Sequence, residues 1–189
     1  MTNTPQFIHL RTHSEYSLLE GAMRLKKLPE LVRAAGMPAI ALTDTNNMFA
    51  ALEFSVGMAE SGLQPIIGCQ IDLQYVPPRL GERLANHASI VLLAQSEAGY
   101  QNLMKLNSCL YLREGSELPH IIMDELVAHS DDLICLTGGP EGPLGKLLQS
   151  AQRPWQRLFW TSWLARFRIV FMWSFSVILV RLVSQRLSG

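Results

Sequence analysis

The alternation of short apolar runs with helix-periodic segments limits this chain to few folds. Residues 7–10 form one short run, and residues 39–43 form a compact apolar run that turn residues bound on both sides. Between the two runs, apolar side chains recur at intervals of three and four residues until Gly36, which predicts a helix that ends there. A strand, a helix and a second buried strand make a crossover unit, so we expect the strands to belong to a parallel sheet.

The same alternation continues along the chain. Helical periodicity predicts helices over residues 48–61 and 97–112. Apolar runs bounded by turn residues predict further strands at residues 65–73, 89–94 and 133–136. Strands that alternate with helices predict an α/β fold with a parallel or mixed sheet.

Composition and cysteine usage narrow the class of protein further. The chain of 189 residues is 48% apolar and 17% charged with a formal net charge of zero, which fits a globular protein and gives no general attraction to nucleic acid. Its three cysteines, Cys69, Cys109 and Cys135, form no CxxC pair, so neither a disulfide framework nor a zinc knuckle is predicted. The first residues lack the pattern of a secretory signal, and we expect a cytoplasmic protein.

Polar side chains follow the first two predicted strands, where α/β proteins often place their active sites. His9 and His13 lie four residues apart, Glu20 follows them, and Asp44 comes directly after the second strand. Imidazoles and carboxylates that converge from several strand ends can hold a divalent metal. The same residues also fit hydrogen-bonded structural histidines and an aspartate that caps the next helix. The residues alone leave both interpretations open.

Five segments closely resemble the start of the bacterial replicative DNA polymerases, the alpha subunits of DNA polymerase III: residues 7–21, 36–44, 62–68, 99–103 and 136–139. In that family this stretch is the polymerase and histidinol phosphatase (PHP) domain. The resemblance covers residues 6–150, after a flexible start at residues 1–5. It implies a distorted (β/α)7 barrel, of which this chain holds an incomplete part.

The resemblance also implies a metal site that has lost most of its ligands. Active members of the family bind a cluster of up to three metals, usually zinc or manganese. By the family pattern His13, Glu20 and Asp44 remain as ligands here, with His9 and His87 as further nitrogen donors. Five other ligand positions of the family are replaced in this sequence, by Arg11, Thr45, Gln70, Ser89 and Gly139. We therefore expect no intact catalytic set and no cofactor; any metal that remains would be zinc or manganese.

Arg11 adds a fixed positive charge where the metal cluster of the family sits. A guanidinium stays protonated and repels divalent cations. One hypothesis is that Arg11 replaces the metal by pairing with Glu20 or Asp44. The alternative is a side chain that faces solvent, since a single exposed pair contributes only ~0–1 kcal/mol.

The last forty or so residues differ in character from the rest of the chain. From Gly142 onward there is no Asp or Glu, and all four tryptophans of the chain lie in this part. Residues 151–189 resemble no part of the family, and we expect out-of-frame sequence that begins near Gln152, for which a helix is one possible structure. The apolar run at residues 169–180 is shorter than the ~20 residues a spanning helix needs, so we do not expect a membrane segment.

The function implied by the resemblance is that of a PHP module in DNA replication. A DNA-directed DNA polymerase, a nucleotidyltransferase, needs a palm domain in which carboxylates hold two magnesium ions, and these residues supply none. We expect this fragment to be inactive alone, to have a structural role, and to bind holoenzyme subunits including the proofreading exonuclease. DNA would be reached through domains absent here. The alternatives are a metal-dependent phosphoesterase or 3′–5′ exonuclease of the PHP family, and a small protein that its tail anchors to a membrane.

Overall fold

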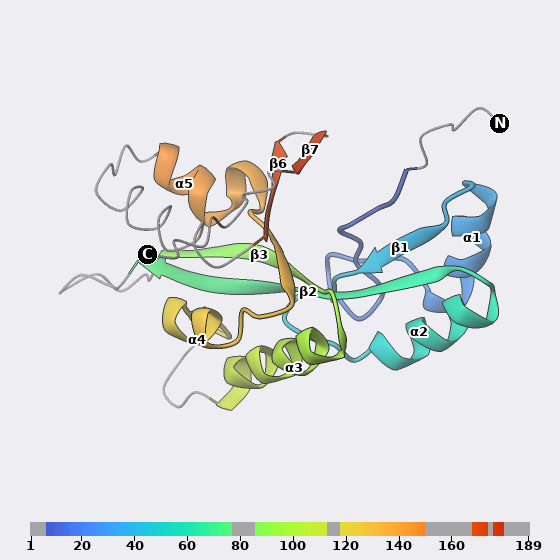
Figure 1. Cartoon of the computed structure of the whole chain (residues 1–189), viewed down its shortest axis with the longest axis horizontal. Helices are drawn as coiled ribbons and strands as arrows, with labels where there is room; N and C mark the ends of the chain where they lie inside the picture. Colours follow the sequence, from blue (N-terminus) through green and yellow to red (C-terminus); the bar gives the residue numbers. More distant parts are fainter. Residues whose placement is uncertain (1–6, 77–85, 113–117, 150–167, 174–175, 180–189) are drawn as a thin grey trace, which may run out of the picture.

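A mixed sheet runs through the molecule, and helices lie along it (Figure 1). The structure is a computed structural model that describes residues 7–76, 86–112, 118–149, 168–173 and 176–179. Within these residues the sheet has seven strands in the order β1-β2-β3-β5-β6-β7, and β4 pairs with β2 off this path. The strands are β1 (Ala39–Leu42), β2 (Gln64–Val76), β3 (Asn86–Ala94), β4 (Ile121–Ile122), β5 (Leu133–Leu136), β6 (Arg168–Trp173) and β7 (Ser176–Leu179).

Helices cover both sides of the long β2–β3 ladder. In Figure 1, α2, α3 and α4 lie on one side of this ladder and α5 lies on the other, next to β3. Two short 3-10 turns, η1 and η2, lead directly into α1 and α5. The helical elements are η1 (Leu25–Lys27), α1 (Leu28–Ala34), α2 (Ala51–Glu60), α3 (Glu97–Leu112), α4 (Met123–Ala128), η2 (Gly139–Glu141) and α5 (Pro143–Gln149).

The expected α/β fold is confirmed. β1 pairs parallel with β2, and α2 connects them as the crossover predicted from the sequence. β2 and β3 pair antiparallel, from Gly68 opposite Leu93 to Val76 opposite Asn86, so the sheet is mixed. The strand direction depends on the connection between the two strands, which the apolar pattern does not encode.

The first apolar run, residues 7–10, was predicted to be a strand and is not one. It lies beside β1 as an irregular segment: the Ala41 N–H donates to the His9 carbonyl at 2.8 Å, and the Thr43 N–H donates to the Thr12 carbonyl at 2.8 Å. Two backbone bonds this far apart are too few for a regular ladder. They nevertheless bring the histidine-containing segment to the end of β1.

Most buried side chains lie between the sheet and its helices. One cluster joins β2, β3 and β5 to α3 and α4, and includes the fully buried Ile71, Leu92 and Leu106. A second cluster joins β1 to α1 and α2 around Ile40 and Met58. These layers fix the end of β1 and the middle of β2, where the candidate site lies.

The tail contains two strands in its described part. β6 pairs parallel with β5, and β7 pairs antiparallel with β6. The helix considered for the tail is therefore wrong for residues 168–173 and 176–179, and the rest of residues 151–189 lies outside the described residues. The β-branched and aromatic residues of β6 favour a strand. The edge of β5 that β3 does not cover offers the backbone groups with which β6 pairs. No helix within the described ranges is long and apolar enough to cross a membrane.

Candidate functional site

Asp44 holds one loop against the end of β1. This is the loop that follows the N-terminal segment. Asp44 is 2% exposed, and its carboxylate accepts three hydrogen bonds. Oδ1 accepts from the Ser14 N–H at 2.7 Å and from the Ser17 hydroxyl at 2.6 Å, and Oδ2 accepts from the Ser14 hydroxyl at 2.7 Å. Both oxygens are therefore engaged by local donors.

A hydrogen-bond chain joins the residues at three of the replaced ligand positions. Arg11 Nε donates to Gln70 Oε1 at 2.9 Å, and Gln70 Nε2 donates to Thr45 Oγ1 at 3.3 Å. The Thr45 hydroxyl donates to Glu20 Oε2 at 2.5 Å, and the same oxygen lies 3.2 Å from His13 Nδ1. This five-residue chain, called the Arg11–His13 chain below, links a guanidinium to an imidazole mostly through neutral groups.

The hypothesis that Arg11 pairs with Glu20 or Asp44 is wrong, because Arg11 contacts a different residue. In the described part of the chain, Glu20 Oε2 lies 3.2 Å from His13 Nδ1, and Arg11 donates to the side-chain amide of Gln70 instead. Asp44 has its oxygens filled by serine donors, while Gln70 is 4% exposed and needs a partner for its carbonyl. Among the described residues, Arg11 is therefore linked to Glu20 through Gln70 and Thr45.

Ser89 belongs to a second polar group on β2 and β3. Its hydroxyl donates to Asp72 Oδ1 at 2.6 Å across the ladder, and Asn46 Nδ2 donates to Asp72 Oδ2 at 3.2 Å. The Asp72 N–H donates in return to Asn46 Oδ1 at 3.1 Å. Asn46 adopts a left-handed conformation with φ 55°, which asparagine tolerates better than most residues. Ser89 is therefore a partner of Asp72 and not of the Arg11–His13 chain.

His87 lies against another histidine and apart from the end of β1. Its ring stacks on that of His120 with centroids 4.5 Å apart and planes at 30°, and Lys146 Nζ donates to its carbonyl at 3.2 Å. Burial lowers the pKa of His87, and the charge of His120 lowers it further. The Nε2 atom of His87 is buried without a partner in the described part of the chain.

The remaining predicted residues occupy two different environments. His9 is exposed and meets the ring of Phe7 edge-on at 4.7 Å. Gly139 begins η2 with φ 64°, a conformation that favours glycine. The structure thus brings His13, Glu20 and Asp44 to one end of β1 and leaves His87 elsewhere. Within the described ranges, no group of three or more His, Cys, Asp or Glu side chains is arranged to hold a metal.

Cys69, within β2, supports the end of β1 from inside the main core cluster. Its thiol is fully buried and donates to the carbonyls of Asp44 and Asn47, at 3.3 Å each. Burial raises the pKa of the Cys69 thiol to about 12. The sulfur therefore stays protonated near neutral pH and serves as a hydrogen-bond donor. Because the thiolate is the reactive form of cysteine, this thiol is not a nucleophile.

Four residues that build these networks were not predicted as site residues from the sequence: Ser14, Ser17, Asn46 and Asp72. Two serines three residues apart after an apolar run are a usual turn signal, and they could have suggested donors for a nearby carboxylate. Asp72 lies inside a strand with its neighbours on other elements, and no local pattern marks it.

Comparison with known proteins identifies relatives along most of the chain. The family model of the PHP domain matches residues 9–170. DNA polymerase III subunit alpha of Caulobacter vibrioides is 42% identical over 148 residues, which cover 77% of this chain and 13% of that protein. The subunit alpha of Rickettsia felis is 38% identical over 156 residues, which cover 82% of this chain and 12% of that protein. The chain spans about an eighth of the length of these relatives.

A solved structure agrees in fold. The crystal structure of a protein described as a metal-dependent phosphoesterase from Bifidobacterium adolescentis superposes with a TM-score of 0.50 at 10% identity, covering 89% of this chain and 87% of the other. An identity this low shows the fold alone. The match of the family model, together with the identity to the polymerase subunits, shows that the chain belongs to the PHP domain family.

Proposed function

We propose that this chain is the PHP module of a DNA polymerase III alpha subunit, and that it serves replication by structural support and partner binding. The observation that carries the proposal is the Arg11–His13 chain, in which Arg11, Gln70 and Thr45 hydrogen-bond along positions where active family members hold metal ligands. In this proposal, the hydrogen bonds replace the metal as the link between the N-terminal segment, β1 and β2.

The donor set at the end of β1 does not fit a metal cluster. Metal ligands must offer lone pairs, and three of the roughly four lone-pair sites of the Asp44 carboxylate already accept bonds from serine donors. Glu20 Oε2 is engaged by the Thr45 hydroxyl and by His13. The Arg11 guanidinium adds a permanent positive charge beside these groups. In this proposal the site carries out no nuclease or phosphoesterase step.

An exposed apolar surface around the loop after β1 supports a role in partner binding. Asn47 Nδ2 donates to the Tyr16 carbonyl at 3.1 Å, and the Tyr111 hydroxyl donates to the Asn46 carbonyl at 2.8 Å, so three distant segments meet here. Exposed apolar side chains that gather into one patch mark interaction sites. This loop surface comprises Tyr16, Leu18, Leu19, Phe49, Leu52 and Tyr111, each at least 39% exposed. In this proposal its partner is the proofreading exonuclease subunit.

Metal analysis and a nuclease assay test the proposed loss of metal chemistry. The purified chain is expected to contain no stoichiometric zinc or manganese and to leave a 3′-labelled oligonucleotide intact. A variant with family ligands restored (Arg11→His, Thr45→His, Gln70→Glu, Ser89→His and Gly139→Cys) serves as the comparison. Stoichiometric metal together with cleavage by the unmodified chain would instead support the alternative of a PHP-family phosphoesterase or exonuclease.

Partner binding is tested with the purified exonuclease subunit. Phe49→Asp on the loop surface should weaken binding at least tenfold, whereas Leu148→Asp on α5, a similarly exposed exchange at another place, should not. Equal binding by both variants would show that the exonuclease subunit does not bind at the loop surface.

The domain boundary at about residue 150 stays a prediction. The relatives align over 148 and 156 residues, whereas the family model extends to residue 170, and β6 pairs with β5. We propose that residues 6–150 form the module and that the tail is out-of-frame sequence. Translation of the other reading frames after residue 150 should then give the continued polymerase sequence, and its absence there would refute the frameshift.

A further inference from the structure

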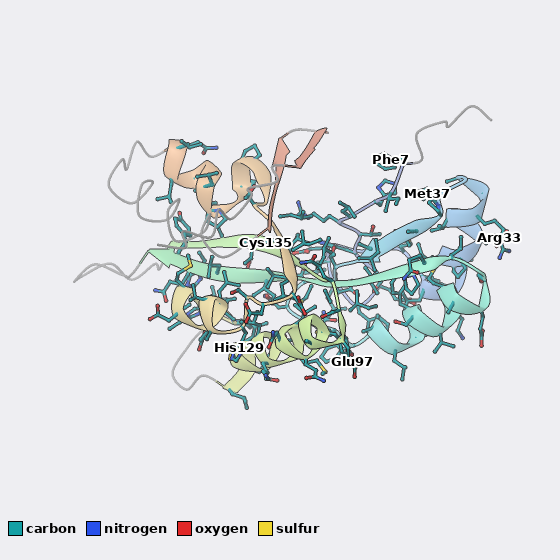
Figure 2. All side chains as sticks on the ribbon, viewed as in Figure 1. Phe7, Arg33, Met37, Glu97, His129 and Cys135 are labelled. Atoms are coloured by element: carbon teal, nitrogen blue, oxygen red, sulfur yellow. The ribbon has the colours of Figure 1, made fainter. Side chains whose placement is uncertain are left out.

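A cavity of about 680 Å³ lies between the N-terminal segment and α1. Its volume is within the range of small-molecule sites. Phe7 and Met37 mark this end of the molecule in Figure 2. One wall of the cavity is apolar and is formed by side chains of α1, β1 and the connection between them, among them Leu28, Leu31 and Met37. Leu31 is 54% exposed, so a ligand can reach this wall from solvent.

The other end of the cavity is lined by polar groups that still have hydrogen-bonding capacity. Arg11 uses its Nε for Gln70, and its two terminal nitrogens have no partner among the residues that the structure describes. Thr12 Oγ1 and His13 Nε2 are buried, and neither has a hydrogen-bond partner within the described ranges. Buried polar atoms without partners are costly, and a bound group that completes their hydrogen bonds would relieve that cost.

The charges at this end of the cavity favour a negatively charged ligand over a positively charged one. Arg11 is permanently positive, and a guanidinium binds carboxylates and phosphates in bidentate geometry. Glu20 also lines the cavity, but its Oε2 accepts from Thr45 and faces His13 Nδ1 at 3.2 Å. Glu20 therefore has polar partners of its own, while the partner of Arg11 among the described residues is a neutral amide.

We propose that this cavity binds a small amphiphilic acid. Its carboxylate or phosphate would contact Arg11, Thr12 and His13, and its apolar body would lie against Leu28 and Leu31. Such binding requires no metal and no partner protein, so it can hold or fail independently of the function proposed above.

Calorimetric titration of the full chain tests this inference with four probes below their micelle concentrations. Octanoate and octyl phosphate carry the two acidic groups on the same apolar body. Octylamine reverses the charge, and inorganic phosphate lacks the body. We expect saturable binding of at least one octyl acid, which identifies the preferred acidic group, and at least tenfold weaker binding of octylamine and of inorganic phosphate.

Variants locate the site. Arg11→Gln removes the charge and should weaken binding of the octyl acid at least tenfold. Leu31→Asp in the apolar wall should weaken it similarly, whereas Leu148→Asp, the same exchange at a similarly exposed residue of α5, should leave it unchanged. Circular dichroism confirms that each variant is folded. Absence of saturable binding, equal binding of octylamine, or full binding by both Arg11→Gln and Leu31→Asp would overturn the proposal.

Discussion

At the scale of single residues, Asp44 has a structural role that its position alone did not reveal. A carboxylate after a strand fits a metal ligand, a helix cap or a support for a loop equally well. In the structure it accepts three hydrogen bonds from Ser14 and Ser17 while 2% exposed. The loop before α1 therefore depends on this carboxylate.

Asp44→Ala is expected to destabilise the protein by about 3 kcal/mol, because it leaves buried donors of Ser14 and Ser17 without an acceptor. Urea unfolding measures the change. Asp131→Ala removes an exposed carboxylate and should cost less than about 0.5 kcal/mol. Similar small losses for both variants would mean that water satisfies the serine donors.

Several positions around Asp44 were named from the sequence, but their hydrogen-bond partners could not be. Arg11, Thr45 and Gln70 were identified as replaced ligands, and the structure joins all three. Arg11 and Gln70 are 59 positions apart in the chain, so their contact depends on how β1 and β2 are aligned. The partner of Arg11 is a neutral amide. Opposite charges in the sequence therefore could not have indicated this pair.

At the scale of elements, a close approach between β2 and β3 depends on one glycine. A Cβ at Gly68 would lie 2.6 Å from the Leu92 carbonyl oxygen and 2.6 Å from Leu93 Cδ2. Apart from its chain neighbours and the backbone of its own helix, Gly57 in α2 has no heavy atom within 4 Å of the corresponding position. The two glycines therefore predict opposite results for the same substitution.

Gly68→Ala should destabilise the protein by roughly 1–3 kcal/mol, because the added methyl forces the strands apart. Gly57→Ala should stabilise it by about 0.5–1 kcal/mol, since alanine restricts the unfolded chain and suits a helix interior. Urea midpoints of the two variants give the comparison. A midpoint for Gly68→Ala at or above that of the unmodified protein would contradict the tight contact.

Elements with a strong local period were predicted well, and those held by distant partners were not. α3 and β5 have the predicted bounds, because each has a regular apolar pattern between clear stops. β2 extends to residue 76, beyond its apolar run, because β3 pairs along its length. The segment at residues 7–10 has the composition of a strand but makes only isolated bonds to β1.

At the scale of the whole molecule, four parts of the chain meet around His87. His87 lies on β3, its ring stacks on His120 before β4, Lys146 of α5 donates to its carbonyl, and Asp72 of β2 raises its pKa. Burial and the neighbouring positive charges outweigh Asp72, so the pKa of His87 is lowered from 6.5. Protonation at this junction should therefore affect global unfolding.

Proton linkage gives the direction in which the free energy of unfolding changes with pH. The folded state binds the His87 proton less tightly than the unfolded chain, so below pH 6.5 the unfolded chain takes up protons first and is favoured. The free energy of unfolding should therefore fall as the pH drops from about 7 through the lowered pKa, and stay level for this group above pH 7. His87→Gln should reduce that slope in urea titrations between pH 7 and 5. Gly57→Ala should shift the whole curve and keep its slope, and an unchanged slope in His87→Gln would show that the stacked pair does not control acid stability.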